Sequence, residues 1–250
     1  MPARTLRPED LPPPQWWPQA AQALLEAHGF DPARITLTPT PEPLDGLLRL
    51  ILAQQNTRPV AQRQWEALRA AYPRWEAALL AEPEDIAAVL KSAGGGLTRS
   101  KSRTVWAILQ RLEEERGALS LRFLRRLPLA EARATLQALP GVGRRTASLL
   151  LLFHLGQPAA AVDTNIERLL QRLEVVPPTW KADKQELWLE GVLPPSAPYR
   201  VAFHRAAVAH GHQICTRQNP HCTTCVLQEW CPSAEYFAQL SRQPGIVGTG

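Results

Sequence analysis

Four cysteines are the residues of this chain whose types and spacing most directly suggest chemistry. All four lie close together near the end of the sequence, at Cys215, Cys222, Cys225 and Cys231. Because the 250-residue chain has no other cysteine, a framework of long-range disulfides is excluded. No export signal is visible, so two local disulfides are only a minor alternative. Four thiolates in such a short stretch indicate a metal site.

The spacing of the cysteines favours an iron–sulfur cluster over a single zinc ion. Zinc ribbons usually grip the metal with two C-x2-C knuckles, and here only Cys222 and Cys225 form one. The longer and unequal outer spacings suit a [4Fe-4S] cluster, which takes one thiolate per iron. Zinc remains the less favoured alternative. Three nearby histidines are expected to be solvated or to contact the ligands, since four thiolates complete a site: His210, His212 and His221.

A second motif is the stretch LPGVGRRTA at residues 139–147, between two expected helices at 131–138 and 146–155. Gly141 and Gly143 allow backbone conformations that other residues avoid, and they leave the amides around Val142 and Arg144 uncovered. Such amides at the start of a helix can bind a phosphate without any sequence preference. The motif therefore predicts a phosphate-binding hairpin between two helices.

An acidic residue lies in the segment AVDTNIER at residues 161–168. Thr164 and Glu167 fit a capping box for a following helix, which puts Asp163 just before the cap. A carboxylate is favoured electrostatically at this positive end of a helix. Taken alone, this position favours a simple capping role for Asp163 over a catalytic one.

The elements that must position these residues are predicted to be helices. Apolar residues recur at i, i+3 and i+4 in 15–28 and repeatedly through 44–155, whereas no stretch shows convincing strand alternation. Proline and glycine clusters separate the segments. The content of 45% hydrophobic residues is sufficient for a core, and no apolar run is long enough to span a membrane. We expect an all-α protein with short connections that resides in the cytoplasm.

The charge of the chain is compatible with a nucleic-acid partner. Lysine and arginine number 28 against 23 acidic residues, giving a net charge of +5. Residues 91–126 contain nine basic and three acidic residues, which suggests a phosphate-facing surface around Arg99, Lys101 and Arg103. An ordinary solvated face explains the same pattern, and net charge alone does not decide between the two.

Taken together, these segments resemble the endonuclease III-type DNA glycosylases, the helix-hairpin-helix superfamily that carries a [4Fe-4S] cluster. The hairpin, the acidic segment and the four cysteines occur in the family's order, and weaker matches lie at 51–57 and 96–101. The resemblance implies two helical domains with a DNA-binding cleft between them. One would be a six-helix barrel at 36–157, and the other would be the cluster domain, joining 1–35 to 158–250.

The resemblance also implies a reaction and the residues that perform it. A damaged base would be flipped out of duplex DNA and excised in base excision repair, since its glycosidic carbon is shielded inside the stack. Gln55 and Leu97 would fill the gap, and Asp163 would stabilise the positive charge that develops on the sugar. The expected partner is duplex DNA with damaged bases or abasic sites, bound by a monomer at the nucleoid. The other implied DNA contacts are Gly141, Val142, Gly143, Arg144 and Lys101.

The chain departs from the family at the position of the lysine that forms a Schiff base in bifunctional members. Arg145 stands there, and a guanidinium stays protonated and cannot act as that nucleophile. We therefore expect a glycosylase for oxidised pyrimidines whose AP-lyase activity is weak or absent, with Lys101 as an alternative amine. Asn165 also replaces the family's usual histidine. Two alternatives remain open: an alkylated-base glycosylase, and a non-catalytic protein that binds DNA damage.

Overall fold

The computed structural model describes residues 6–241, and within these residues the regular elements are helices and no strand occurs. The expected all-α fold is confirmed. Five short 3-10 helices accompany the α-helices in the described part, two of them in the cysteine loop: η4 (Cys222–Thr224) and η5 (Gln228–Trp230). The α-helices are α1 (Trp17–Ala27), α2 (Pro43–Ala53), α3 (Arg58–Ala71), α4 (Trp75–Leu79), α5 (Pro83–Ser92), α6 (Thr98–Arg116), α7 (Leu129–Gln137), α8 (Arg144–Phe153), α9 (Thr164–Arg172), α10 (Ala182–Val192), α11 (Ala197–Gln213) and α12 (Ser233–Ser241).

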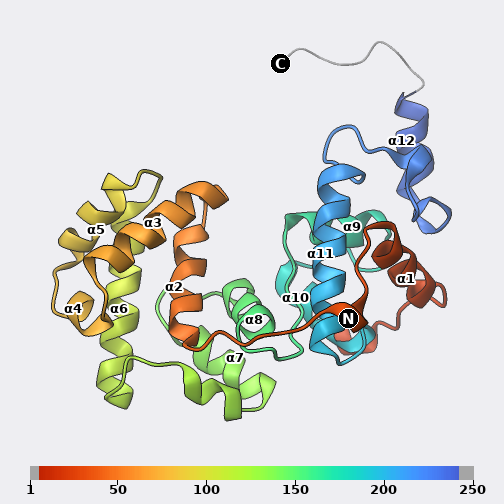
Figure 1. The fold of residues 1–250 in the computed structure, drawn as a ribbon. Helices are drawn as coiled ribbons and strands as arrows, with labels where there is room; N and C mark the ends of the chain where they lie inside the picture. Colours follow the sequence, from red (N-terminus) through yellow and green to blue (C-terminus); the bar gives the residue numbers. More distant parts are fainter. Residues whose placement is uncertain (1–5, 242–250) are drawn as a thin grey trace, which may run out of the picture. The chain divides into compact units, whose positions relative to one another are not determined.

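The chain divides into two compact units. One is the continuous segment Thr38–Gln157, which contains α2 to α8. The other combines Met1–Leu37 with Pro158–Gly250 and contains α1 and α9 to α12. In the ribbon of Figure 1, the second unit therefore carries both ends of the colour scale, red and blue. Segments far apart in the sequence build its core.

Helix α2 is the centre of the unit formed by residues 38–157. Pro43 occupies its first turn, where the missing amide is not needed, and the Glu42 side chain accepts a hydrogen bond from Leu44 N. The apolar side chains of α2 recur at helical spacing and face α3, α6 and α8. Those that are fully or almost fully buried are Leu44, Leu47, Leu48, Ile51 and Leu52.

Aromatic side chains hold the other unit together. The Trp17 ring lies 5.0 Å from that of Trp188 and 6.0 Å from that of Phe203, so it joins α1 to α10 and α11. Helix α11 packs against both α1 and α9 (Figure 1). Trp16 stacks on Trp230 of the cysteine loop at 6.2 Å. Both N-terminal tryptophans thus pack against other parts of the chain.

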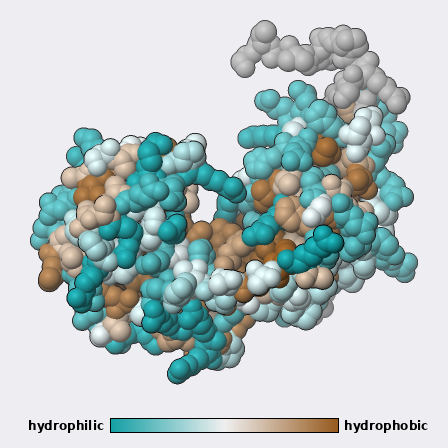
Figure 2. Space-filling model, in the orientation of Figure 1, coloured by the Kyte–Doolittle hydropathy of each residue, from teal (hydrophilic) through white to brown (hydrophobic). Residues whose placement is uncertain are grey.

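Hydrophilic side chains predominate on the face drawn in Figure 2, in keeping with the burial of the leucine-rich helix faces. Among the described residues, no helix combines the length and apolar character needed to cross a membrane.

Candidate nucleic-acid interface and metal centre

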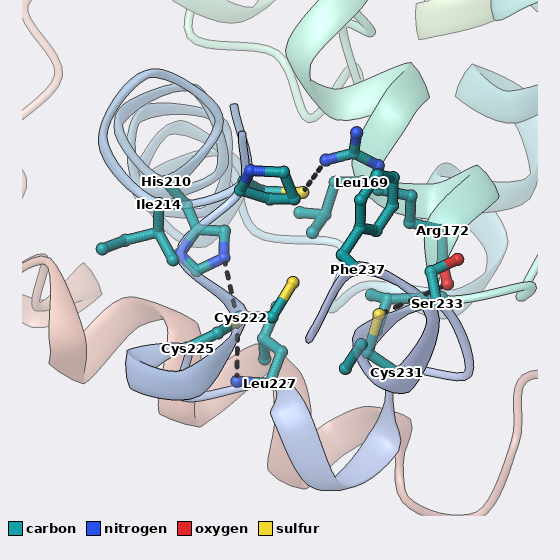
Figure 3. Close-up of a pocket in the computed structure, with 14 residues that line it drawn as sticks. Leu169, Arg172, His210, Ile214, Cys222, Cys225, Leu227, Cys231, Ser233 and Phe237 are labelled. Atoms are coloured by element: carbon teal, nitrogen blue, oxygen red, sulfur yellow. Dashed lines mark hydrogen bonds between the residues drawn. The ribbon is translucent and has the colours of Figure 1, made fainter. Parts of the chain in front are cut away.

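The four cysteines surround one small cavity beside α9, α11 and α12 (Figure 3). Cys215 follows the end of α11, Cys222 and Cys225 bracket η4, and Cys231 follows η5. All four are free thiols, so the local disulfide alternative is not realised. The structure therefore brings together the cysteines that the sequence predicts as ligands.

The chemistry of this cavity fits a cluster better than a single metal ion. No three His, Cys, Asp or Glu side chains within residues 6–241 are grouped so that they could hold one ion. Four thiols spread around a cavity are what a cube with one thiolate per iron requires. Burial raises the pKa of the Cys225 thiol to about 11. A bound iron would displace the proton from such a thiol.

Several hydrogen bonds fix the sulfur atoms. Leu227 N donates to Cys225 Sγ at 3.4 Å. The guanidinium of Arg172 donates to Cys215 Sγ at 3.2 Å and to the Thr216 carbonyl at 2.7 Å. Sequence reasoning missed Arg172, because an arginine on a helix has no local pattern that points to a sulfur 43 residues away. Such contacts around a metal site commonly orient its ligands and tune its potential.

The hairpin forms between α7 and α8, and α8 begins at Arg144 rather than at 146 as expected. The expectation for Val142 is corrected, because its side chain is buried and its amide donates to the Leu139 carbonyl at 3.2 Å. Gly143 is the N-cap of α8 and supplies no capping side chain. The first bond inside α8 runs from Ala147 N to the Gly143 carbonyl, so the preceding amides have no partner within the helix. The first turn of α8 contains no acidic residue, and it contains Arg144 and Arg145. This helix start is open and electropositive.

The two glycines of the hairpin differ in their conformational need. Gly141 has φ +68°, and a Cβ there would lie 2.6 Å from Thr104 Cγ2 on α6. Gly143 has φ −80°, and a Cβ there would meet nothing within 4 Å. The unusual backbone geometry that both glycines allow is therefore used at Gly141 and not at Gly143. Gly143 therefore leaves open space at the start of α8.

Gln55 and Leu97 share an unusual backbone conformation. Their φ angles are +52° and +57°, which is the left-handed region that side chains disfavour. Both residues are exposed, and Leu97 is one of the large apolar side chains on the surface, at 49% exposure. Strained residues of this kind persist only where their surroundings enforce the conformation, and they cluster at functional sites.

A polar network holds these two strained positions together. Asn56 Nδ2 donates to the Leu52 carbonyl and to Gln64 Oε1, both at 2.9 Å. Gln64 Nε2 donates to the Gly94 carbonyl at 2.7 Å, and Gly96 N donates to Asn56 Oδ1 at 3.3 Å. The loop after α2 is thereby tied to the loop before α6. No local pattern predicts this network, since Gln64 has the sequence surroundings of an ordinary polar residue on α3.

Arg145 and Gln55 line the same open hollow, which has a volume of about 400 Å³. Gln54 also lines it and donates through Nε2 to Thr146 Oγ1 at 3.3 Å, linking the end of α2 to the start of α8. The Arg145 side chain is exposed. The remaining lining residues are Leu50, Ala53 and Leu149.

The structure corrects the prediction for Lys101. Its side chain is buried at 3% exposure, and Nζ donates to the Leu52 carbonyl at 2.8 Å. Burial lowers its pKa. An ammonium group that closes the end of α2 does not face a phosphate and does not reach a sugar. Arg99 and Arg103 of the same helix do remain exposed.

Asp163 lies at the start of α9, where the sequence predicted that it would directly precede the capping residue. It is the N-cap itself, and its Oδ1 accepts from Asn165 N and Ile166 N, both at 2.9 Å. The predicted capping box with Thr164 as the cap is therefore wrong. Asp163 Oδ2 accepts from Asn165 Nδ2 at 2.9 Å. The carboxylate is half-buried and held by three donors in a fixed orientation.

Two segments of the chain match known protein families. Residues 48–195 match the HhH-GPD superfamily of base excision DNA repair proteins. Residues 215–231 match the iron–sulfur binding domain of endonuclease III, and this range begins and ends at a cysteine of the cavity. The iron–sulfur prediction is confirmed by this match.

Curated relatives include two endonucleases III. The chain is 30% identical to that of Bacillus subtilis over 192 residues, which is 76% of this chain and 80% of the relative. It is 37% identical to that of Escherichia coli K12 over 105 residues, or 42% of this chain. The chain spans about half the length of the first curated relatives it matches.

Solved structures share the fold. A non-covalent endonuclease III–DNA complex aligns with a TM-score of 0.72 at 23% identity, covering 92% of this chain and 98% of that one. A trapped endonuclease III–DNA covalent intermediate aligns with a TM-score of 0.71 at 23% identity, covering 89% and 97%.

Proposed function

The chain belongs to the HhH-GPD superfamily of base excision DNA repair proteins, and we propose that it is a DNA N-glycosylase with little or no AP-lyase activity. Its substrate is duplex DNA with a damaged base, of which oxidised pyrimidines are the proposed class. We further propose that it acts as a monomer on DNA in the cytoplasm. The observation that carries the lyase part is that Arg145 stands in the hollow it shares with Gln55.

The proposed reaction is hydrolysis of the bond between the sugar C1′ and the base nitrogen. The bonding electrons leave with the base, positive charge develops on the sugar, and water adds to C1′. The Asp163 carboxylate stabilises that charge and accepts the proton from water. The two backbone amides and the Asn165 amide that donate to Asp163 support this role, because they fix its orientation. The product is an intact abasic site.

DNA binding is assigned to the α8 hairpin and the two strained loops. The amides that begin α8 bind a backbone phosphate without reading sequence, assisted by Arg144 and Arg145. Gln55 and Leu97 fill the space left by the flipped nucleotide. The exposure of these two side chains and the network that holds them support this assignment.

The experiment is single-turnover cleavage of a duplex that carries one thymine glycol, worked up with and without alkali. We expect strand breaks only after alkali, because a guanidinium forms no Schiff base and leaves the abasic site intact. Breaks without alkali would overturn the proposal for Arg145. They would also require an amine other than Lys101, whose Nζ is buried against Leu52.

A substitution sharpens this test. We expect Arg145→Lys to introduce a covalent adduct that borohydride traps, because a lysine amine at this exposed position can attack the sugar carbon. The matched control is Arg144→Lys, one residue earlier on the same helix turn, which should give no adduct. Failure of Arg145→Lys to trap substrate that the parent protein excises would show that this position does not face the sugar.

The competing function is a damage-binding protein without catalysis. It would bind the lesion duplex but excise nothing across a panel of oxidised and alkylated bases. Excision of alkylated bases alone would instead keep the proposed hydrolysis and change the substrate class from oxidised to alkylated bases.

A further inference from the structure

Two histidines connect helix α1 to a cysteine of the cluster cavity. His28 is the residue that ends α1, and its Nε2 lies 3.1 Å from Nδ1 of His210 on α11. The two rings are nearly perpendicular, at 89°. His210 is buried at 1% exposure, and its Nε2 lies 3.5 Å from Cys225 Sγ. In Figure 3 a dashed line runs from the His210 ring toward Cys225, and both residues line the cavity.

The chemistry of the three groups fixes the position of each proton. A cysteine thiolate bound to iron accepts hydrogen bonds and does not donate them. His210 must therefore carry its proton on Nε2, which leaves Nδ1 as an acceptor. His28 must then carry its own proton on Nε2 and donate it to His210 Nδ1. The result is one chain of donors, from His28 through His210 to the sulfur of Cys225.

The other end of α1 contacts the cysteine loop directly. Trp16, the N-cap of α1, stacks on Trp230, which directly precedes Cys231. Helix α1 thus contacts the cysteine loop directly at its start, by ring stacking, and is linked to Cys225 at its other end through His210 of α11. These contacts join the start of the chain to a loop about 200 residues later.

We propose that His28 and His210 form a hydrogen-bond relay that sets the reduction potential of the iron–sulfur cluster and protects it from loss. Both are positioning residues that act through Cys225. An N–H donor beside a cluster sulfur stabilises the more negative, reduced state and so raises the potential. His28 holds His210 in the donating tautomer, as partners outside a metal site commonly do. The relay adds to the Leu227 amide, which donates to the same sulfur.

The inference rests on the cluster assignment and not on base excision. Iron and sulfide analysis of the purified full chain therefore comes first, with about four irons per chain expected. The reduction potential is then measured at an electrode, and cluster loss in air is followed by visible absorbance. His210→Phe should lower the potential and speed cluster loss about fivefold, the effect of one lost hydrogen bond.

Three further variants make the test specific. His28→Phe should act in the same direction with a smaller effect, because His210 keeps its ring and loses only its fixed tautomer. His210→Gln keeps an N–H donor and should restore most of the potential. The control is His221→Phe, which removes an exposed imidazole beside Cys222 and should change neither quantity.

The possible outcomes distinguish failure of the relay from failure of the cluster assignment. A shift with His210→Phe but none with His28→Phe would overturn the relay and leave a single donor. If His210→Phe does not fold, the His28→Phe and His210→Gln pair still decides the matter. If every histidine variant had the same reduction potential and rate of cluster loss as the His221→Phe control, the inference would be overturned, while base excision would stand. A chain without iron would overturn both the cluster and the relay, whatever its activity on DNA.

Discussion

Helices α8 and α9 begin in opposite ways. The N-cap of α8 is Gly143, which has no side chain, and the first turn holds no acid. The N-cap of α9 is Asp163, whose carboxylate accepts from two amides of that first turn. Both helix starts carry the same partial positive charge from their aligned peptide dipoles. One is left open, and the other is filled by an anion of the protein itself.

This difference determines which charge each helix start attracts. An open helix start beside two arginines attracts an external anion, and for a DNA-binding protein that anion is a phosphate. A helix start closed by its own carboxylate repels phosphate and presents negative charge to a developing cation. Under the proposed function, α8 of one unit binds the DNA backbone, and the carboxylate at the start of α9 in the other unit stabilises the charge on the sugar.

The largest effect is expected for Asp163→Asn. Excision under single-turnover conditions should fall by about 10²–10⁴-fold, because the amide neither balances the sugar's charge nor accepts a proton. Asparagine caps a helix as well as aspartate does, so the melting temperature should stay close to that of the parent protein. The measurement is the rate of base release from a lesion duplex, together with thermal unfolding.

Asp31 offers a matched control for that substitution. It is also an N-cap, of η2 (Pro32–Arg34), and its side chain accepts from Ala33 N at 2.9 Å. Asp31→Asn should leave excision unchanged. Equal rates for Asp163→Asn and the parent protein would reduce Asp163 to a capping residue and make the two helix starts equivalent in function.

A smaller effect is expected for Gly143→Asp, which gives α8 the cap that α9 has. A Cβ fits at this position, and an aspartate there would bond the first amides. We expect α8 to be stabilised while duplex affinity falls about tenfold and the salt dependence of binding decreases by about one phosphate contact. The loss should be the same with and without a lesion, since the contact carries no sequence information.

The control for charge is Gly143→Asn, which caps the helix with a neutral group. It should lose less affinity than Gly143→Asp, because part of the effect of the aspartate is repulsion of the phosphate. Unchanged binding and salt dependence in Gly143→Asp would place the phosphate contact elsewhere than on the α8 amides.

The comparison also shows what the sequence could predict. Helical periodicity is local, so the all-α fold follows from spacing alone, and so does the gathering of the cysteines. The helix starts are predicted less closely, since α8 begins at Arg144 and not at 146. The capping residue of α9 was misplaced by one position, because aspartate and threonine at 163 and 164 are both good caps and only the backbone decides.

Contacts between distant segments could not be predicted in this way. The basic stretch around Lys101 predicts a surface lysine. Its ammonium instead donates to the Leu52 carbonyl, 49 residues away in sequence. The contact between His28 and His210 spans 182 residues. Neither pairing leaves a local pattern, because each depends on how whole helices pack. The same reason applies to Gln64, which joins two loops through one buried amide group.

The smallest effect, on stability rather than chemistry, is expected for Gly141→Ala in the hairpin. Its φ of +68° costs an alanine about 1–2 kcal/mol, and the new methyl would press on Thr104. Gly143→Ala in the same loop has an ordinary φ and open space, so it should lose little stability in denaturant unfolding. The two alanines thus separate the geometry of the turn from the openness of the amides. If Gly143→Ala were the more destabilising, the open start of α8 would itself be required for folding. The contrast with α9 would then concern stability and not the binding of an anion.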